Sequence, residues 1–306
     1  MSAPQATPTD DRFHAPAEAH PLWSETAWFA FSAPERKLCG CVYPLFRPKL
    51  GVCSVAVHVW DDSACEPWRV LYSRTQWHLR MPKGDLSACS VGGLELSCLE
   101  PLRRYRVRYA DGELCALDLE YEGLFPPHVA ARAGGRGHLD QPCRVRGALR
   151  LRGEEFRIDG FEMRDRSWHV RDDLRSTRAS YSYGIASERE AFLAGAICDG
   201  DECRIATGFL LRAGEKHALA GGTRRVLERR DGHPLRIAIE ATDTAGRRLE
   251  ARGLTQSRLA NQATPGMFAW LSLTEWEWQG QRAAGEDQDV WSPDLLARAG
   301  AQSASR

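Results

Sequence analysis

The chain has 306 residues, and its 41 lysines and arginines balance its 41 aspartates and glutamates. A formal net charge of zero provides no global basic field for collecting nucleic acid or anionic lipid, so we expect neither as a partner. Hydrophobic residues make up 43% and charged residues 27%, which indicates a globular protein, and no apolar run of about 18 residues exists that could form a membrane-spanning helix.

The first residues show no basic start followed by an apolar core, so no secretory signal is expected. We therefore expect a cytoplasmic protein whose ten cysteines are reduced thiols. No two cysteines have Cys-x-x-Cys spacing, and the pairs His138 with Asp140 and His169 with Asp172 match no recognised metal motif, so no metal site is expected. Residues 1–20 are rich in proline and alanine, which predicts a flexible leader.

The first predicted strand begins near residue 24. Its two-residue alternation places Glu25 on the same face as Ala27, Phe29 and Phe31. A carboxylate on an apolar face is either bonded to the backbone or to an arginine at the edge of the core, or belongs to a site. Glu25 is therefore a candidate catalytic residue, with a structural role as the alternative.

A second informative strand covers residues 52–60. Cys53 and the valines that alternate with it form an apolar face, which predicts a packed core on that side. His58 and Trp60 lie on the other face, where we expect solvent or the wall of a ligand cavity.

A loop from residue 123 to 141, which contains Pro126-Pro127 and Gly134-Gly135, predicts the boundary between two domains. We expect an N-terminal β domain over residues 21–142, a C-terminal β domain over 143–296 and a tail over 297–306. The glycines of the loop do not form Gly-x-Gly-x-x-Gly after a strand, so no dinucleotide cofactor is expected.

The segment 147–173 is predicted to fold as three short strands with turns at Gly153-Glu154 and Asp159-Gly160. On the third strand a carboxyl group falls in line with two large apolar side chains, those of Phe161 and Met163, because of the two-residue period. This group is Asp165, and it precedes the polar and aromatic cluster Ser167-Trp168-His169.

Two interpretations of Asp165 remain open. Burial against Phe161, Met163 and Trp168 would raise its pKa, so that it could protonate an alkene or carbonyl at neutral pH. Alternatively, its neighbours Arg164 and Arg166 pair with it and lower its pKa. His169 is a candidate base or proton relay in the first interpretation.

Short strands separated by turn residues continue through the second half, which is the spacing typical of an antiparallel barrel or sandwich. Near the end, one face of a strand carries three tryptophans and two hydroxyls, which predicts either core or the wall of a ligand cavity. These residues are Trp270, Ser272, Thr274, Trp276 and Trp278. Helical periodicity is scarce, and the best candidate helix runs from 292 to 300.

Four motifs together resemble a bacterial family of uncharacterised two-domain lipocalin-like proteins. In that family the central motif reads His-x-Glu-Gln, two short strands, then Arg-Asp-His-Ser-Trp-Gly-x-Arg; here His138-Leu-Asp-Gln-Pro142 precedes the segment 147–173. This chain has Arg166 where the family usually has His and His169 where it usually has Gly. The other three motifs are Ser24-Glu-Thr-Ala-Trp-Phe-Ala-Phe31, Tyr43-Pro44 followed by Gly51, and Gly285-Glu-Asp-Gln-Asp-Val-Trp291.

The resemblance implies a distant similarity to carotenoid 1,2-hydratase (hydroxyneurosporene synthase), tocopherol cyclase and the lipocalin-like Diels–Alderases. Those proteins fold as two antiparallel β-barrels and act on hydrophobic, isoprenoid or polyketide molecules without a redox cofactor. It therefore implies an all-β fold with two lipocalin-like barrels or half-open sandwiches and a few short helices.

We expect a cofactor-independent hydration, isomerisation or cyclisation of a hydrophobic small molecule in a cavity between two β domains. The expected catalytic residues are Asp165 as the acid, His169 as the base or relay, and Glu25. The expected substrate-binding residues are Trp168, Phe161, Met163, Trp270, Trp276, Trp278, His58 and Trp60. A non-catalytic carrier of a lipid-like ligand and a protein-interaction scaffold are the alternatives, and the sequence leaves a homodimer open.

Overall fold

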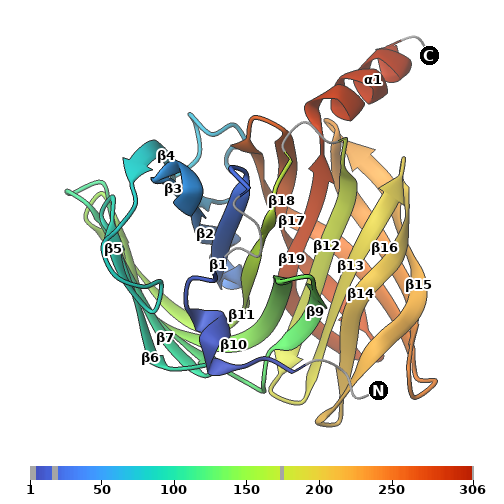
Figure 1. Cartoon of the computed structure of the whole chain (residues 1–306). Coiled ribbons are helices and arrows are strands. Elements are labelled where there is room, and N and C mark those ends of the chain that lie inside the picture. The colour runs from blue at the N-terminus through green and yellow to red at the C-terminus, as the bar shows by residue number, and fades with distance from the viewer. Residues whose placement is uncertain (1–4, 16–19, 173–175, 305–306) are drawn as a thin grey trace. The chain divides into compact units, whose positions relative to one another are not determined.

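The computed structural model describes residues 5–15, 20–172 and 176–304, and the chain divides into two compact units (Figure 1). The first unit comprises residues up to 60 together with 68–171, and the second comprises 61–67 together with the residues from 172 onward. Strands account for 71% of the structure and helices for 6%, which confirms the predicted all-β class with two lipocalin-like β domains.

Within the described residues, the first unit is built on an eleven-stranded antiparallel sheet. Its order is β4-β3-β2-β1-β11-β10-β8-β7-β6-β5, with β9 paired to β10. The strands are β1 (Trp23–Ala33), β2 (Leu38–Arg47), β3 (Val52–Trp60), β4 (Tyr72–Arg80), β5 (Ala88–Val91), β6 (Leu94–Glu100), β7 (Arg104–Asp111), β8 (Cys115–Gly123), β9 (His128–Ala133), β10 (Arg136–Leu151) and β11 (Glu154–Val170). The short helices η1 (Pro8–Asp11), η2 (Pro34–Arg36) and η3 (Pro48–Leu50) complete it.

The core of the first unit lies on one face of this curved sheet. Phe29 and Phe31 of β1 pack there with Tyr121 of β8 and with three valines of β3, Val55, Val57 and Val59, all of them buried. The two-residue alternation in the sequence thus placed the apolar faces of β1 and β3 correctly, because successive side chains of a strand point to opposite faces of its sheet.

The centre of this unit is the long hairpin of β10 and β11. The predicted turn at Asp159-Gly160 is wrong: Asp159 pairs with Arg146 and Gly160 with Val145, so β11 runs on without interruption. An ion pair between Arg144 and Asp159 stabilises the pairing at this point. Asp-Gly favours a turn only where the chain has no partner strand to extend along, and here β10 provides one.

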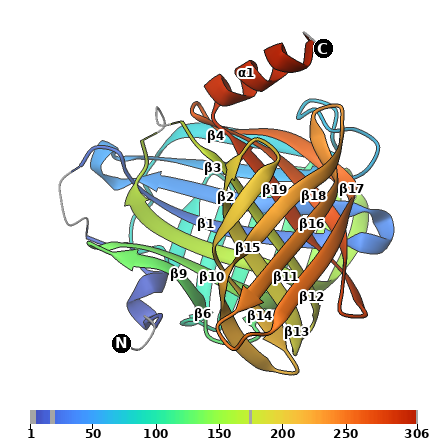
Figure 2. The same cartoon turned by 90° about the vertical axis from the view of Figure 1, so that its right-hand side faces the viewer.

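The second unit is a closed barrel, whose strands β14 to β18 face the reader in Figure 2. Its strands are β12 (Arg178–Ser187), β13 (Glu190–Asp199), β14 (Glu202–Arg212), β15 (Glu215–Arg230), β16 (His233–Asp243), β17 (Arg248–Thr264), β18 (Met267–Trp278) and β19 (Gln281–Trp291). The helix predicted from 292 to 300 is α1 (Pro293–Ala304). No helix among the described residues is both long enough and apolar enough to cross a membrane.

Three features differ from the sequence expectations. The division between the units falls at 171/172 instead of 142/143, because β10 and β11 pair with β8 and β1 of the first unit. Part of the expected flexible leader is ordered, since the Asp11 carboxylate accepts hydrogen bonds from the Leu102 amide and the Tyr105 hydroxyl. Finally, Cys198 and Cys203 form a disulfide between β13 and β14, whereas all cysteines were expected to be reduced thiols.

Candidate active site

Strand β11 presents two different sets of charged side chains on its two faces. Arg164, Arg166 and Trp168 point to the core side of the sheet, while Asp165 and Ser167 point to the other side. The neighbouring strand β10 adds His138 and Asp140 to the Asp165 side, because His138 lies opposite Ser167 and Asp140 opposite Asp165. Carboxyl groups at directly opposed positions of neighbouring strands have Cβ atoms about 5 Å apart.

Asp165, Asp140 and His138 form one electrostatic group. Burial raises the pKa of Asp165 to about 6, and the charge of Asp140 raises it further, whereas His138 and Arg171 oppose the rise. Burial acts to lower the pKa of His138, but the attraction of Asp140 and a hydrogen bond of 2.9 Å from its Nε2 to Asp140 Oδ1 raise that pKa to about 9. At neutral pH His138 is therefore cationic, while Asp165 exchanges its proton near pH 6.

A set of hydrogen-bonding groups lies beside this cluster. The Thr26 and Ser167 hydroxyl oxygens are 2.7 Å apart, and the Arg171 guanidinium donates to Ser167 Oγ at 3.0 Å. Burial raises the pKa of Tyr43, whose phenol also bonds with Thr26 and Arg171, so it stays protonated at neutral pH. The Arg171 Nε is buried and has no hydrogen-bond partner among the described residues.

An apolar wall borders these polar groups. The indole of Trp28 lies opposite Asp165 on β1 and meets the ring of Tyr43 edge to face at 5.5 Å. Met163, two positions from Asp165, is fully buried, and Phe161 is partly buried with the Arg144 guanidinium 4.8 Å from its ring. Apolar side chains beside a few convergent polar groups are typical of a small-molecule site.

His169 belongs to the same face but lies farther along the strand. Four residues of a strand span about 13 Å, so Asp140 is much closer to Asp165 than His169 is. Burial and the nearby Arg171 lower the pKa of His169 to about 4, and its Nδ1 lies 2.9 Å from the carbonyl of Val170. His169 is therefore a neutral imidazole at neutral pH, with Nδ1–H assigned as the donor to this carbonyl.

Glu25 and Trp168 are on the core face and do not join Asp165. The Glu25 carboxylate pairs with Arg166, both side chains being fully buried, and accepts a hydrogen bond of 2.8 Å from the His14 amide. Burial acts to raise the pKa of Glu25, but His14 and Arg166 outweigh it and lower the pKa. The ring of Trp168 stacks on that of His14 with 3.9 Å between centroids.

Arg164 is also bound on the core face, to Asp11 at 3.3 Å and to Gln141 Oε1 at 2.8 Å. Among the described residues, the arginines that flank Asp165 in the sequence thus take other carboxylates as ion-pair partners. This arrangement favours the interpretation of Asp165 as a partly buried acid with a raised pKa over that of an arginine-paired carboxylate.

The remaining predicted binding residues lie elsewhere in their units. His58 is buried on β3, bonds to Ser73 Oγ at 2.8 Å, and has its pKa lowered to about 4 by burial; Trp60 on the same strand is fully buried. Trp276 and Trp278 fill the core of the second unit, where Phe192 packs edge to face on both, and Trp270 is partly buried in the same barrel.

Sequence reasoning missed five residues of this site as site residues. They are Thr26, Tyr43, His138, Asp140 and Arg171. The signal was present, because all five lie inside the motifs that carried the family resemblance, and the two-residue spacing of His138 and Asp140 predicts a common face. No cluster of three or more His, Cys, Asp or Glu side chains with metal-site geometry occurs in the described part of the chain.

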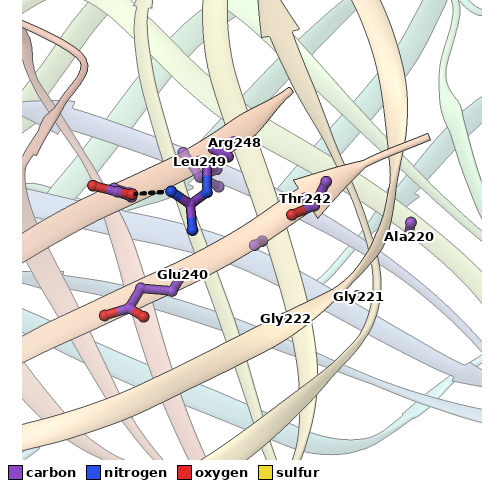
Figure 3. Close-up of a pocket in the computed structure, with 9 residues that line it drawn as sticks. Ala220, Gly221, Gly222, Glu240, Thr242, Arg248 and Leu249 are labelled. Carbon is purple, nitrogen blue, oxygen red and sulfur yellow. Dashed lines mark ion pairs between the residues drawn. The ribbon is translucent and has the colours of Figure 1, made fainter. Parts of the chain in front are cut away.

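A hollow of about 390 Å³ on the second unit is a weaker candidate (Figure 3). It lies along β15, β16 and β17 beside Gly221 and Gly222, and its charged groups are exposed. Arg248 and Glu250 form an ion pair of 3.7 Å across it, with both side chains more than half exposed. Solvated, mutually paired charges of this kind contribute little energy.

Comparison with known proteins identifies relatives of the fold. A protein from Nitrosomonas europaea, provisionally assigned as AttH, superposes with a TM-score of 0.60 at 14% identity, covering 88% of this chain and 91% of the other. Kievitone hydratase from Nectria haematococca superposes with a TM-score of 0.58 at 11% identity, covering 90% and 92%. Identities this low establish the shared fold alone.

These likenesses confirm the resemblance to two-domain lipocalin-like proteins at the level of the fold. No curated protein matches the sequence significantly. A family described as a domain of unknown function, DUF7064, matches residues 7–286, and the chain therefore belongs to that family.

Proposed function

We propose that the protein is an enzyme that hydrates, isomerises or cyclises a hydrophobic, isoprenoid- or polyketide-like small molecule by acid–base chemistry. The observation that carries the proposal is the register of β10 and β11, which sets Asp165 opposite Asp140 and next to the His138 cation. Pairs of carboxyl groups whose surroundings separate their pKa values are the usual means of holding an acid and a base together near pH 7.

Asp165 is the general acid in this proposal. With a pKa of about 6, roughly a tenth of Asp165 holds its proton at pH 7 and about half at pH 6, and this proton can be delivered to an alkene carbon or a carbonyl oxygen. The Trp28 ring opposite Asp165 provides a π face that stabilises positive charge developing on the substrate carbon.

In this proposal Asp140 is the base. From the sequence, His169 was expected in that role. Because His138 is already protonated, it cannot accept a proton, but its hydrogen bond keeps the Asp140 carboxylate oriented. In a hydration, Asp165 gives its proton to one alkene carbon, water adds to the other, and Asp140 accepts the proton that the water loses. His169 is left as a relay candidate at the end of the strand.

Arg171 and Tyr43 supply hydrogen bonds for a substrate oxygen. The buried Arg171 Nε is an unused donor among the described residues, and the Tyr43 phenol stays protonated. Donors fixed in advance at the position where negative charge develops stabilise an enolate or alkoxide without reorganisation.

The likeness to kievitone hydratase supports this class of reaction, since that protein is named for a hydration and shares the fold over most of both chains. The partly apolar wall of Trp28, Tyr43 and Met163 supports a hydrophobic substrate. A carrier protein for a lipid-like ligand is the second candidate, because the same wall would hold a ligand without any chemistry.

Two measurements separate these functions. Native mass spectrometry of gently purified protein identifies the co-purifying hydrophobic molecule, and this molecule or its precursor then serves as the substrate. The Asp165→Asn variant is expected to bind it with unchanged affinity and to lose turnover by at least about a hundredfold. Asp159→Asn, on the same strand but ion-paired to Arg144, is the matched control and should turn over normally. Normal turnover in Asp165→Asn would refute the catalytic assignment.

A further inference from the structure

The interior of the second barrel is divided into an apolar end and a polar end. Trp276 and Trp278 fill the apolar end with Phe192. Toward the other end of β18, Ser272 lies opposite Asp287 and Trp270 opposite Asp289 on β19. These positions alternate with outward-facing residues along β18, so they share the inner face with the two core tryptophans.

Four arginines reach the polar end, against two buried aspartates. Arg224 is fully buried and holds Asp287 through two hydrogen bonds of 3.0 and 2.6 Å. Arg178 and Arg229 contact Asp289 at 2.7 and 3.0 Å. The fourth is Arg258.

A break in the register of β17 accounts for the position of Arg258. The strand carries a bulge between Thr255 and Ser257, which reverses its alternation and brings Arg258 opposite the inward-facing Ser272. The partner of Arg258 is Asp231, whose carboxylate is 3.6 Å away and 76% exposed. Arg229 has a similar second partner, because its Nη2 lies 2.6 Å from the Asp201 carboxylate, which is 53% exposed.

Several polar atoms in this cluster are buried without a hydrogen-bond partner among the described residues. They are Arg178 Nε, Arg258 Nε, Ser180 Oγ, Ser272 Oγ and His233 Nδ1. Ser272 is fully buried and Ser180 is 4% exposed, and Ser180 lies opposite Asp289 on β12. A buried donor left unsatisfied costs about 1–3 kcal/mol, so such atoms indicate a place that another molecule fills.

The surroundings of these atoms define the chemistry of that molecule. Two of the unsatisfied atoms are guanidinium N–H donors and two are hydroxyl groups, which matches an anion. The rings of Trp270 and Trp291 border the same region: the Arg178 guanidinium lies 3.7 Å from the Trp291 ring, and His233 lies 5.8 Å from the Trp270 ring. The side chains of Arg229 and Arg258 remain 22% and 27% exposed, so the region is accessible to solvent.

We infer that the polar end of the second barrel binds an aromatic organic anion through its carboxylate or phosphate group. Arg258 and Arg178 donate to the anionic group, and the Ser180 and Ser272 hydroxyls complete its hydrogen bonds. The indoles of Trp270 and Trp291 pack against its ring. This site lies within the second unit and shares no residue with the acid–base site of the first.

The full-length protein is titrated with benzoate and with phenyl phosphate, and binding is followed by calorimetry and by tryptophan fluorescence. Inorganic phosphate tests whether the ring is needed, and benzamide tests whether the charge is needed. The variants are Arg258→Gln and Ser272→Ala, with Arg252→Gln as the matched control. Arg252 is an arginine of the same strand that is 59% exposed and pairs with Glu240 at 3.8 Å on the outside.

We expect saturable binding of benzoate or phenyl phosphate, and none of benzamide. Arg258→Gln should weaken binding about tenfold or more and Ser272→Ala several-fold, while Arg252→Gln should leave it unchanged. Ser272→Ala removes no native side-chain hydrogen bond, so it keeps the inference testable if Arg258→Gln unfolds, which near-ultraviolet circular dichroism reports. Absence of saturable binding at millimolar concentration, equal binding of benzamide, or equal loss in Arg252→Gln would overturn the inference.

Discussion

Replacing Asp165 by asparagine should stabilise the protein at neutral pH, because the structure holds this carboxyl group at an energetic cost. Its pKa is raised from 3.8 to about 6, mainly by burial. Between these two values the folded chain binds more protons at this site than the unfolded chain does, so stability falls as the pH rises through that window. A difference of about two pH units corresponds to about 3 kcal/mol, fully present above pH 6 and absent below pH 3.8.

Urea unfolding of the wild type and Asp165→Asn at a series of pH values from 4 to 8 measures this difference. The gain in unfolding free energy should be near zero at the acidic end and approach about 3 kcal/mol at the neutral end. Because the chain has two units, the transition of the first unit must be followed separately, for example by hydrogen exchange of β10 and β11 amides.

Asp159→Asn controls for the loss of a charge on the same strand. Arg144 and Arg157 hold the pKa of Asp159 below its ordinary value, so its contribution to stability is present at neutral pH and is lost on acidification, the opposite trend. Destabilisation of Asp165→Asn at pH 7 or above would show that Asp165 is an ionised, paired carboxylate, and the assignment of a buried acid would then be wrong.

Three further predictions follow from the same structure. Asp140→Asn removes a neighbouring negative charge and should lower the pKa of Asp165 from about 6 toward 3.8, which carbon-13 NMR titration of the carboxyl groups checks; an unchanged value would contradict the pairing. Gly285→Ala should prevent closure of the second barrel, because a Cβ there would lie 2.0 Å from the Tyr183 carbonyl oxygen; normal folding by circular dichroism would contradict this. Trp276→Ala should cost about 3–5 kcal/mol in urea unfolding, since this side chain is fully buried in the core; a cost below 1 kcal/mol would favour a ligand-facing role.

The fold was predictable because alternation along a strand is a local signal. The apolar faces of β1 and β3, and the common face of Met163 and Asp165, follow from side-chain parity within a strand. The break at Asp159-Gly160 and the domain boundary at 142/143 were mispredicted for the opposite reason. Turns and loops were predicted from local residues alone, because the sequence does not show which strand will pair with them. Strand pairing overrides such local preferences.

The candidate site was only partly predictable because it depends on which strands become neighbours. Asp165 was identified from its own strand, but its partner Asp140 comes from β10, and the pairing is not encoded in either strand alone. The rival hypothesis that Arg164 and Arg166 pair with Asp165 ignored the alternation that sends both arginines to the other face. Glu25 shows the reverse case: its alternation placed it on the apolar face, and it pairs there with an arginine, Arg166, as the structural alternative describes.

The alternation of acid and guanidinium groups along β11 restricts how this hairpin can change in evolution. Insertion or deletion of one residue between Asp159 and Asp165 would rotate every later side chain to the opposite side of the sheet. Arg164 and Arg166 would then no longer reach their partners Asp11 and Glu25, and the Asp165 side chain would point into the core. Length changes should therefore be confined to the tip at Arg152-Gly153, where the chain reverses beyond the paired residues Leu151 and Glu154. Homologues that preserve the chemistry should keep the spacing from position 159 to 169 constant even where the residues themselves differ.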